Sequence, residues 1–137
     1  MAINNDIIYH TDFLEVIQTG VFDLDDGILI FSHILNICRH TGLKKIIIDY
    51  RELKGERGGT AKTLYGLHVV EQYNTYLEQG GAKLKFAYIT PCITSYEPGA
   101  QVARQGGFPF KQFETRNDAL EWLDLKTINK INELCQL

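Results

Sequence analysis

Along the chain, segments with continuous or alternating apolar residues, typical of strands, are followed by segments with apolar residues three or four positions apart, typical of helices. The longest run of β-branched apolar residues lies within residues 45–50, where Ile46, Ile47 and Ile48 follow one another. A continuous apolar run is typical of a strand that is covered on both faces. We therefore expect residues 45–50 to form the central strand of an α/β sheet, followed by a polar loop over residues 51–59.

Two shorter strands are predicted before this one. Residues 6–10 and 13–18 have the composition of strands, and the polar residues Thr11 and Asp12 lie between them. This arrangement favours a hairpin at one edge of the sheet, with Gly20 ending the second strand.

A helix is predicted from about Leu24 to His40, closed by Thr41 and Gly42. Asp23 is a suitable N-cap for it, and Asp26 three residues later completes a weak capping box. Apolar positions that recur at three- and four-residue steps should form its core face. These positions are Leu24, Ile28, Phe31, Leu35 and Cys38.

The longest predicted helix spans residues 60–79 and stops at the glycine pair 80–81, because glycine accepts the positive φ of a helix C-cap. Four apolar residues at helical spacing are expected to form its core stripe. They are Leu64, Leu67, Val70 and Leu77.

The rest of the chain predicts two more strands and further helices. A strand is expected at residues 83–90, followed by a short helix that Thr94 and Glu97 would cap and that ends near residues 106–107. A last strand over residues 108–113 contains Pro109, which places it near an edge of the sheet.

Thr115 with Asp118 predicts the cap of another helix, in which three apolar residues pack inward. They are Ala119, Leu120 and Leu123. The tail over residues 126–137 is expected to form a further short helix.

This order predicts one α/β domain over residues 1–137, with no internal boundary. Strands separated by helices are mostly parallel neighbours joined by right-handed crossovers. The expected architecture is a single-layer, mixed but mostly parallel sheet of four to five strands with helices packed on it.

Composition narrows the function classes. The chain has 137 residues, 45% of them hydrophobic, and a net charge of −3 with a pI near 5.8. The charge argues against a nucleic-acid binder, which normally has a basic face. No apolar run approaches the ~20 residues of a transmembrane helix, and the first residues lack the features of a signal peptide. We therefore expect a cytoplasmic protein.

Several stretches together resemble the STAS superfamily, and more closely its SpoIIAA-like branch, whose fold is related to CRAL-TRIO-type lipid-binding domains. They are Gly20 before the first helix, residues 44–51, residues 85–89, and Phe113 followed by residues 117–123. In this order and spacing they cover a core of about residues 6–124.

The resemblance implies a small cytoplasmic domain used for protein–protein regulation or ligand sensing, usually without catalysis, as in bacterial anti-sigma factor antagonists. In those proteins a serine in an Asp-Ser motif, at the start of the helix after the central strand, is phosphorylated. The corresponding residues 56–63 contain no Asp-Ser. The phosphorylation switch therefore does not transfer, although Thr60 and Thr63 are hydroxyl residues at this place.

The same segment is a candidate anion-binding site. Gly58, Gly59 and Thr60 precede the long helix, where free N–H groups and the helix dipole point at a ligand, and Arg57 and Lys62 flank them. The alternative is an ordinary loop with Thr60 as the N-cap.

Asp49 and Arg51 lie at the end of the central strand, where ligands of α/β sheets usually bind. They are therefore candidate binding residues. The alternative is that they pair with local groups and have a structural role.

Cys92 is the best candidate nucleophile, since it follows a strand and precedes a helix N-terminus. No base is related to it in sequence, and the histidines lack the spacing of metal ligands. The four histidines are His10, His33, His40 and His68. We therefore expect no enzyme activity, no cofactor and no metal site.

Tyr65, Val69, Tyr73 and Tyr76 widen the apolar arc of the long helix beyond what one sheet face needs. Tyrosines suit interfaces and ligand pockets, because each combines an apolar ring with a polar tip. These residues are therefore candidates for a homodimer interface or a pocket, with packing at the margin of the core as the alternative.

Two hypotheses for the function follow. The first is a non-enzymatic STAS-type module that binds a protein partner of unknown identity and self-associates as a homodimer, using the loop 51–60 and the exposed side of the following helix. The alternative is a carrier or sensor of a small apolar or amphipathic ligand, with a pocket between helices and sheet lined by Phe31, Tyr65 and Phe86.

Overall fold

Five strands and four helices alternate along the described part of the chain. The computed structural model describes residues 2–55, 59–91 and 98–125. The elements are β1 (Ile3–Tyr9), β2 (Leu14–Val21), α1 (Leu24–Thr41), β3 (Lys45–Lys54), α2 (Gly59–Glu78), β4 (Lys85–Ile89), α3 (Pro98–Gln105), β5 (Phe110–Phe113) and α4 (Arg116–Trp122). The predicted order of elements is confirmed.

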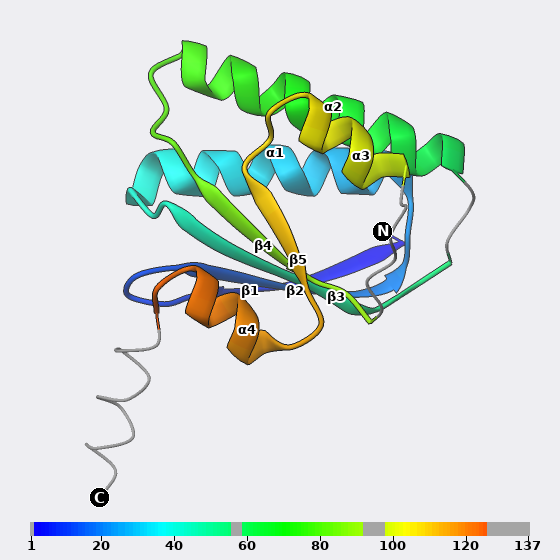
Figure 1. Cartoon of the computed structure of the whole chain (residues 1–137), viewed down its shortest axis with the longest axis horizontal. Helices are drawn as coiled ribbons and strands as arrows, with labels where there is room; N and C mark the ends of the chain where they lie inside the picture. The colour runs from blue at the N-terminus through cyan, green and yellow to red at the C-terminus, as the bar shows by residue number, and fades with distance from the viewer. Residues whose placement is uncertain (1, 56–58, 92–97, 126–137) are drawn as a thin grey trace, which may run out of the picture.

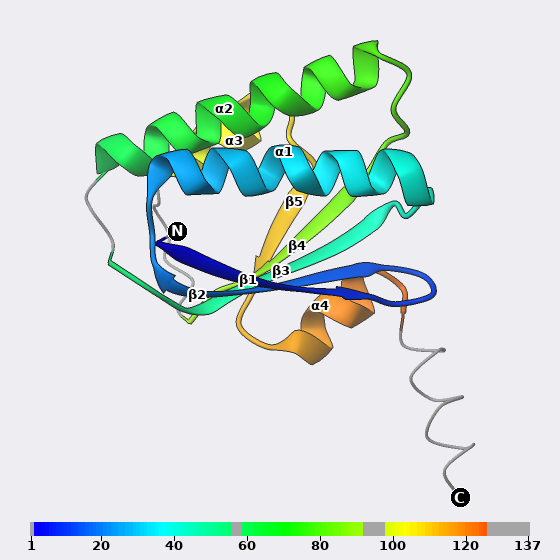
Figure 2. The ribbon, with the colours of Figure 1, turned by 180° about the vertical axis from the view of Figure 1, so that it is seen from behind.

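The strands form one sheet in the order β1-β2-β3-β4-β5. β1 and β2 are an antiparallel hairpin, and all other neighbours are parallel. Figures 1 and 2 show α1, α2 and α3 on one face of the sheet, which we call the three-helix face, and α4 on the other, the α4 face. The expected α/β architecture, the edge hairpin and the central position of β3 are confirmed.

β3 is covered on both faces, as its apolar run predicts. Side chains alternate along a strand, so Ile46 and Ile48 point to the three-helix face and Ile47 to the α4 face. All three are 2% exposed or less. The larger core therefore lies under α1 and α2, and a smaller one lies between the sheet and α4.

Several strand boundaries differ from the prediction, including those of β1, β4 and β5, and the differences in β2 and β3 have a visible cause. β3 continues to Lys54 instead of ending at Tyr50, because Glu52 and Leu53 pair with β2 beyond a register shift. β2 in turn runs through Gly20 instead of ending there. Gly20 has a φ of +93°, and a Cβ at this position would collide with the backbone at residue 2. The glycine therefore kinks the strand rather than ending it.

The predicted core stripe of α2 is wrong for Leu64 and Leu67, whereas Val70 and Leu77 do pack against the core. Leu64 and Leu67 are 40% and 51% exposed, whereas Val69 and Tyr73 are 2% and 5% exposed. The tyrosines are buried because their hydroxyl groups find partners: Tyr73 accepts a hydrogen bond from the Leu84 backbone N–H at 3.1 Å. The helix therefore turns Tyr73 and Tyr76 inward and Leu64 and Leu67 outward.

The predicted caps of α1 and α4 are confirmed. The carboxylate of Asp23 accepts the backbone N–H of Asp26 at 3.0 Å, and Gly42 closes α1 with a φ of +79°. Thr115 accepts the N–H of Asp118 at 3.2 Å at the start of α4. The cap expected from Thr94 and Glu97, and the helix expected over residues 126–137, lie outside the described residues.

Ile47→Ala is expected to destabilise the protein by about 2–5 kcal/mol, the usual range for truncating a fully buried side chain. Ile47 has no exposed surface and contacts the core under α4. Urea denaturation measures the difference in the free energy of unfolding. Ile8→Ala is the control, since Ile8 is 40% exposed on the edge strand β1. A loss below about 1 kcal/mol at Ile47 would contradict the packing described here.

Candidate functional site

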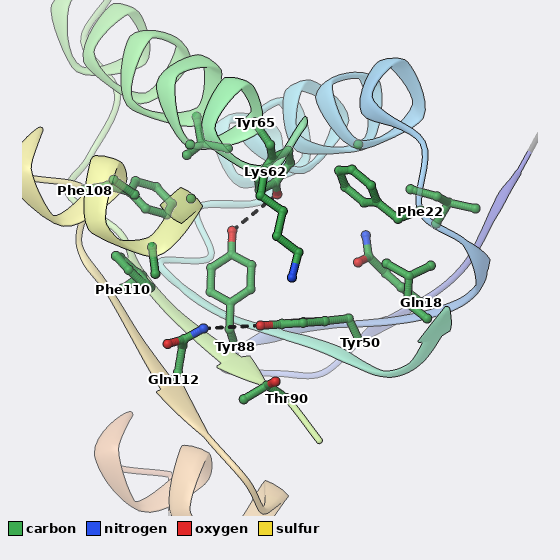
Figure 3. A pocket seen from close by; sticks show the side chains of 18 of the residues that line it. Gln18, Phe22, Tyr50, Lys62, Tyr65, Tyr88, Thr90, Phe108, Phe110 and Gln112 are labelled. Carbon is green, nitrogen blue, oxygen red and sulfur yellow. Dashed lines mark hydrogen bonds between the residues drawn. The ribbon is translucent and has the colours of Figure 1, made fainter. Parts of the chain in front are cut away.

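A cavity of about 350 Å³ lies between the three-helix face and the helices α2 and α3. It opens at the carboxyl ends of β3, β4 and β5, where ligands of parallel sheets usually bind. Figure 3 labels ten of its lining residues. These are Gln18, Phe22, Tyr50, Lys62, Tyr65, Tyr88, Thr90, Phe108, Phe110 and Gln112.

Aromatic rings form much of the cavity wall, and several of them pack edge to face against one another. The ring of Tyr88 lies 6.0 Å from that of Tyr50 and 5.9 Å from that of Phe110, at interplanar angles of 74° and 90°. Phe22 meets Tyr65 in the same way at 6.2 Å. Such pairs prefer this geometry because ring edges are positive and ring faces negative. The packing of aromatic residues therefore gives the cavity a defined wall.

Tyrosine hydroxyls supply polar groups inside this apolar wall. The hydroxyls of Tyr65 and Tyr88 lie 3.5 Å apart, and the side-chain amide of Gln112 donates to the Tyr50 hydroxyl at 3.3 Å. Burial raises the pKa of Tyr65 to about 12, and burial next to the Tyr65 hydroxyl raises the pKa of Tyr88 well above its ordinary value. Both phenols therefore stay protonated and neutral near pH 7.

The charged side chains of the described lining are two lysines. Lys62 reaches the cavity from α2 and Lys54 from the end of β3, while no aspartate or glutamate of the described residues lines it. Figure 3 shows the side chain of Lys62 pointing from α2 into the cavity, in the direction of Tyr50. The described part of the lining therefore carries positive charge only, in a chain whose net charge is −3.

Two helical glycines allow the helices to approach closely around the cavity. A Cβ at Gly66 of α2 would lie 2.5 Å from the carbonyl oxygen of Gly99 in α3. A Cβ at Gly27 of α1 would lie 3.2 Å from the ring of Tyr65. The absence of a side chain at Gly66 therefore sets the distance between α2 and α3, which both form the wall.

The candidate residues Asp49 and Arg51 lie away from this cavity. Side chains alternate along β3, so Asp49 and Arg51 point to the α4 face, the same face as Ile47. There the Arg51 guanidinium donates to the Asp49 carboxylate at 2.7 and 3.0 Å. Burial raises the pKa of Asp49, but hydrogen bonds from Arg51 outweigh it and the net shift is downward. The local ion pair corresponds to the structural alternative considered for these residues.

A second ion pair on the α4 face joins distant parts of the chain. Arg116 at the start of α4 donates to both oxygens of the Glu15 carboxylate, at 2.8 and 3.0 Å, and His10 lies 2.8 Å from it. Burial raises the pKa of Glu15, but the bonds from Arg116 and His10 lower it further than burial raises it. This buried carboxylate was not recognised from the sequence, because its partner lies 101 residues away.

The candidate anion site at the start of α2 stays a prediction. Arg57 and Gly58 lie outside the described residues. Gly59 begins α2, one residue earlier than expected, so Thr60 lies in the first turn rather than before it. Thr60 is exposed and Thr63 is half-buried.

The tyrosine face of α2 is already covered within the chain. Val69, Tyr73 and Tyr76 are 2%, 5% and 3% exposed, which leaves them almost no surface to contribute to a dimer. The interface role expected for them is therefore wrong. Tyr65 and Val69 instead line the cavity, in agreement with the pocket alternative.

Phe31 and Phe86, which were expected to line the same pocket as Tyr65, do not line this cavity. They pack against each other in the main core with ring centroids 5.4 Å apart. Tyr50, Tyr88 and Gln112 take their place in the lining and were not recognised. Alternation along the predicted strands was the available signal, since Tyr88 shares its face with Thr90 and Phe110 with Gln112.

Cys92 lies outside the described residues. Cys38 is buried in the main core, and burial raises its pKa to about 11, so that its thiol stays protonated. Within residues 2–55, 59–91 and 98–125, no group of three His, Cys, Asp or Glu residues is arranged to hold a metal ion. None of the helices in these ranges is both long and apolar enough to span a membrane.

Comparison with known proteins identifies the fold. The anti-sigma factor antagonist SpoIIAA in its unphosphorylated form matches 90% of this chain and 96% of its own, with a TM-score of 0.52 and 14% identity. An anti-sigma factor antagonist from Mycobacterium paratuberculosis matches 87% of this chain and 92% of its own, with a TM-score of 0.54 and 15% identity. The chain thus has the SpoIIAA-like fold of STAS domains, and the resemblance seen in the sequence is confirmed for the fold.

A third solved structure is an uncharacterized protein from the DUF3478 family with a SpoIIAA-like fold, from Shewanella loihica. It matches 89% of this chain and 94% of its own, with a TM-score of 0.45 and 22% identity. No protein-family model and no curated protein matches the chain.

Arg116→Met is expected to lower the free energy of unfolding at pH 7 by an amount on the order of 1–3 kcal/mol, because it leaves the buried Glu15 carboxylate without its main donor. In the wild type the folded-state pKa of Glu15 lies below its unfolded value. Its stabilising contribution is therefore present above the unfolded pKa and is lost as the pH falls through the folded pKa.

The difference between variant and wild type should accordingly shrink in acid, as denaturation series from pH 7 down to pH 3 would reveal. Arg104→Met, which removes an exposed guanidinium from α3, is the control. A difference that stays constant over this range would contradict the role assigned to the Glu15 carboxylate.

Gly66→Ala is expected to destabilise the protein by about 1–3 kcal/mol, although alanine favours helices, because the new methyl group must displace the backbone of α3. Gly27→Ala is the matched control. Its methyl group meets only side chains, the rings of Tyr65 and Phe22, which are able to shift. Thermal unfolding of both variants compares them, and a Gly66→Ala variant as stable as Gly27→Ala would contradict the close packing of α2 on α3.

Proposed function

We propose that this chain is a non-enzymatic regulatory module of STAS type that binds a protein partner through the outer face of α2. The observation that carries the proposal is the exposure of Leu64 and Leu67 on that face. Residues three apart on a helix are neighbours on its surface, so the two leucines form one apolar patch. The STAS fold supports the proposal, because two similar structures are anti-sigma factor antagonists.

The chemistry of the surrounding surface suits a protein partner. Residues next to the leucine patch on α2 are polar, with Glu71 and Thr60 exposed. A small apolar centre with a polar rim is the usual composition of a protein interface. Self-association belongs to the same proposal, with the patch of Leu64 and Leu67 replacing the buried tyrosines as its contact surface.

The absence of catalysis is also part of this proposal. The described lining of the cavity contains no histidine, cysteine, aspartate or glutamate. These are the most usual groups for proton transfer and nucleophilic attack at neutral pH, and the phenols of Tyr65 and Tyr88, whose pKa burial raises, are poor bases there. The cavity therefore supports binding better than turnover.

A second candidate function is supported by the cavity itself. We infer that the chain carries or senses a small amphipathic ligand there. About 350 Å³ is at the lower end of the range of ~300–1,000 Å³ that is usual for ligand pockets. The apolar wall with a few polar groups is also typical of such pockets. The two functions are compatible, since the cavity and the leucine patch use different faces of α2.

The double variant Leu64→Asp, Leu67→Asp is expected to keep the fold and to lose its binding to the partner protein. Both side chains are exposed, so the free energy of unfolding should change by less than about 1 kcal/mol, whereas a buried carboxylate at an interface is costly. A photo-crosslinking amino acid at position 64 or 67, used in cells of the source organism, identifies what contacts the patch.

Leu29 on α1 is the matched control, because it is a leucine that is 59% exposed on another helix. The proposal requires a protein that crosslinks at positions 64 and 67 but not at 29, and that the double variant fails to bind when both are purified. Sedimentation of the wild type and the double variant decides whether a second copy of the chain occupies the patch. The same proteins captured at all three positions would contradict the proposal.

A further inference from the structure

The charge of the cavity restricts its ligand. Both charged side chains of the described lining, Lys54 and Lys62, are cations. The tyrosine hydroxyls of Tyr65 and Tyr88 stay neutral, since burial raises the pKa of both. No described group of the lining therefore neutralises the lysines, and a negatively charged ligand would do so.

Lys62 is placed to meet such a ligand. Its side chain leaves α2 and points into the cavity in the direction of Tyr50 (Figure 3). It is half-buried and forms no hydrogen bond or ion pair with the residues that the structure describes. A half-buried ammonium loses part of its hydration, and an anionic partner would compensate for this loss.

The opposite part of the cavity is apolar. Phe108 and Phe110 stack with their centroids 5.6 Å apart, and Val69 and Ala103 complete this side. Phe108 is continuous with the main core, being 5.6 Å from Phe31. A ligand that fits both parts has an acidic group at one end and an apolar body at the other.

The geometry points to a small amphipathic carboxylate as the ligand, its acid held by the ammonium of Lys62 and its apolar body packed on Tyr88, Phe108 and Phe110. This inference rests on the carrier or sensor function proposed above and names its ligand class. Lys54 is exposed, so the half-buried ammonium of Lys62 is the one that the ligand would neutralise, and it matches a single negative charge. The volume of about 350 Å³ favours a molecule of one or two rings, or a chain of comparable bulk.

Isothermal titration calorimetry with four probes tests the inference. Two are carboxylates, 1-naphthoate and decanoate, and two are alcohols with the same apolar bodies, 1-naphthalenemethanol and 1-decanol. The wild type should bind each carboxylate about tenfold or more tightly than its alcohol, since a charge-assisted hydrogen bond contributes at least this much.

Three variants separate the charge of Lys62 from other effects. Lys62→Met should remove the preference for carboxylates and leave the affinity for alcohols within about twofold, while Lys62→Arg should retain the preference because it retains the charge. Lys111→Met is the matched control, since Lys111 is exposed on β5 and does not line the cavity. Thermal unfolding of each variant checks that the fold is intact.

The outcomes distinguish this inference from the function on which it rests. Alcohols that bind as tightly as carboxylates, or a preference that survives Lys62→Met, would overturn the carboxylate inference and leave the cavity as a binding site for apolar molecules. Failure of all four probes to bind the wild type would count against the inference and the carrier or sensor function together.

Discussion

The burial of β3 on both faces is the constraint on which the rest of the structure depends. Successive isoleucines of β3 point to opposite faces of the sheet, so both faces must be covered by helices. The hairpin of β1 and β2 protects one flank of β3, and β4 with β5 protects the other. Parallel pairing then brings the carboxyl ends of three strands together under α2 and α3.

The sequence was sufficient for the order of elements, the central strand and the caps, because these depend on local patterns. Asp23, Gly42 and Thr115 act within one turn of their own helix, and their roles are visible in the residues themselves. The rotation of α2 was not predictable in this way. Leucine is the more apolar residue, yet Tyr73 is buried and Leu67 exposed, because the Tyr73 hydroxyl satisfies a backbone N–H beside β4 that a leucine would leave without a partner.

The candidate site was only partly predictable for the same reason. Tyr65 was recognised as a pocket residue and Lys62 as a flanking cation, but Asp49 and Arg51 were placed at the site by their position at the end of a strand. Position along a strand does not say which face a side chain occupies, and a shift of one residue reverses it. Tyr50 lies between them on the other face and lines the cavity. Side chains alternate from Ile48 onwards, so this alternation would have assigned Tyr50 to the face of Ile48 and both Asp49 and Arg51 to the opposite face.

The pairing of Arg116 with Glu15 links the second strand to the last described helix, 101 residues further along the chain. Its consequence concerns the order in which the molecule assembles. α4 has only seven residues, too few to be stable as an isolated helix, so it gains its structure from docking on a sheet that already exists. Loop closure over such a separation is entropically costly and contributes to slow folding. The α4 face is therefore completed last during folding, and α4 is the element that local unfolding releases first.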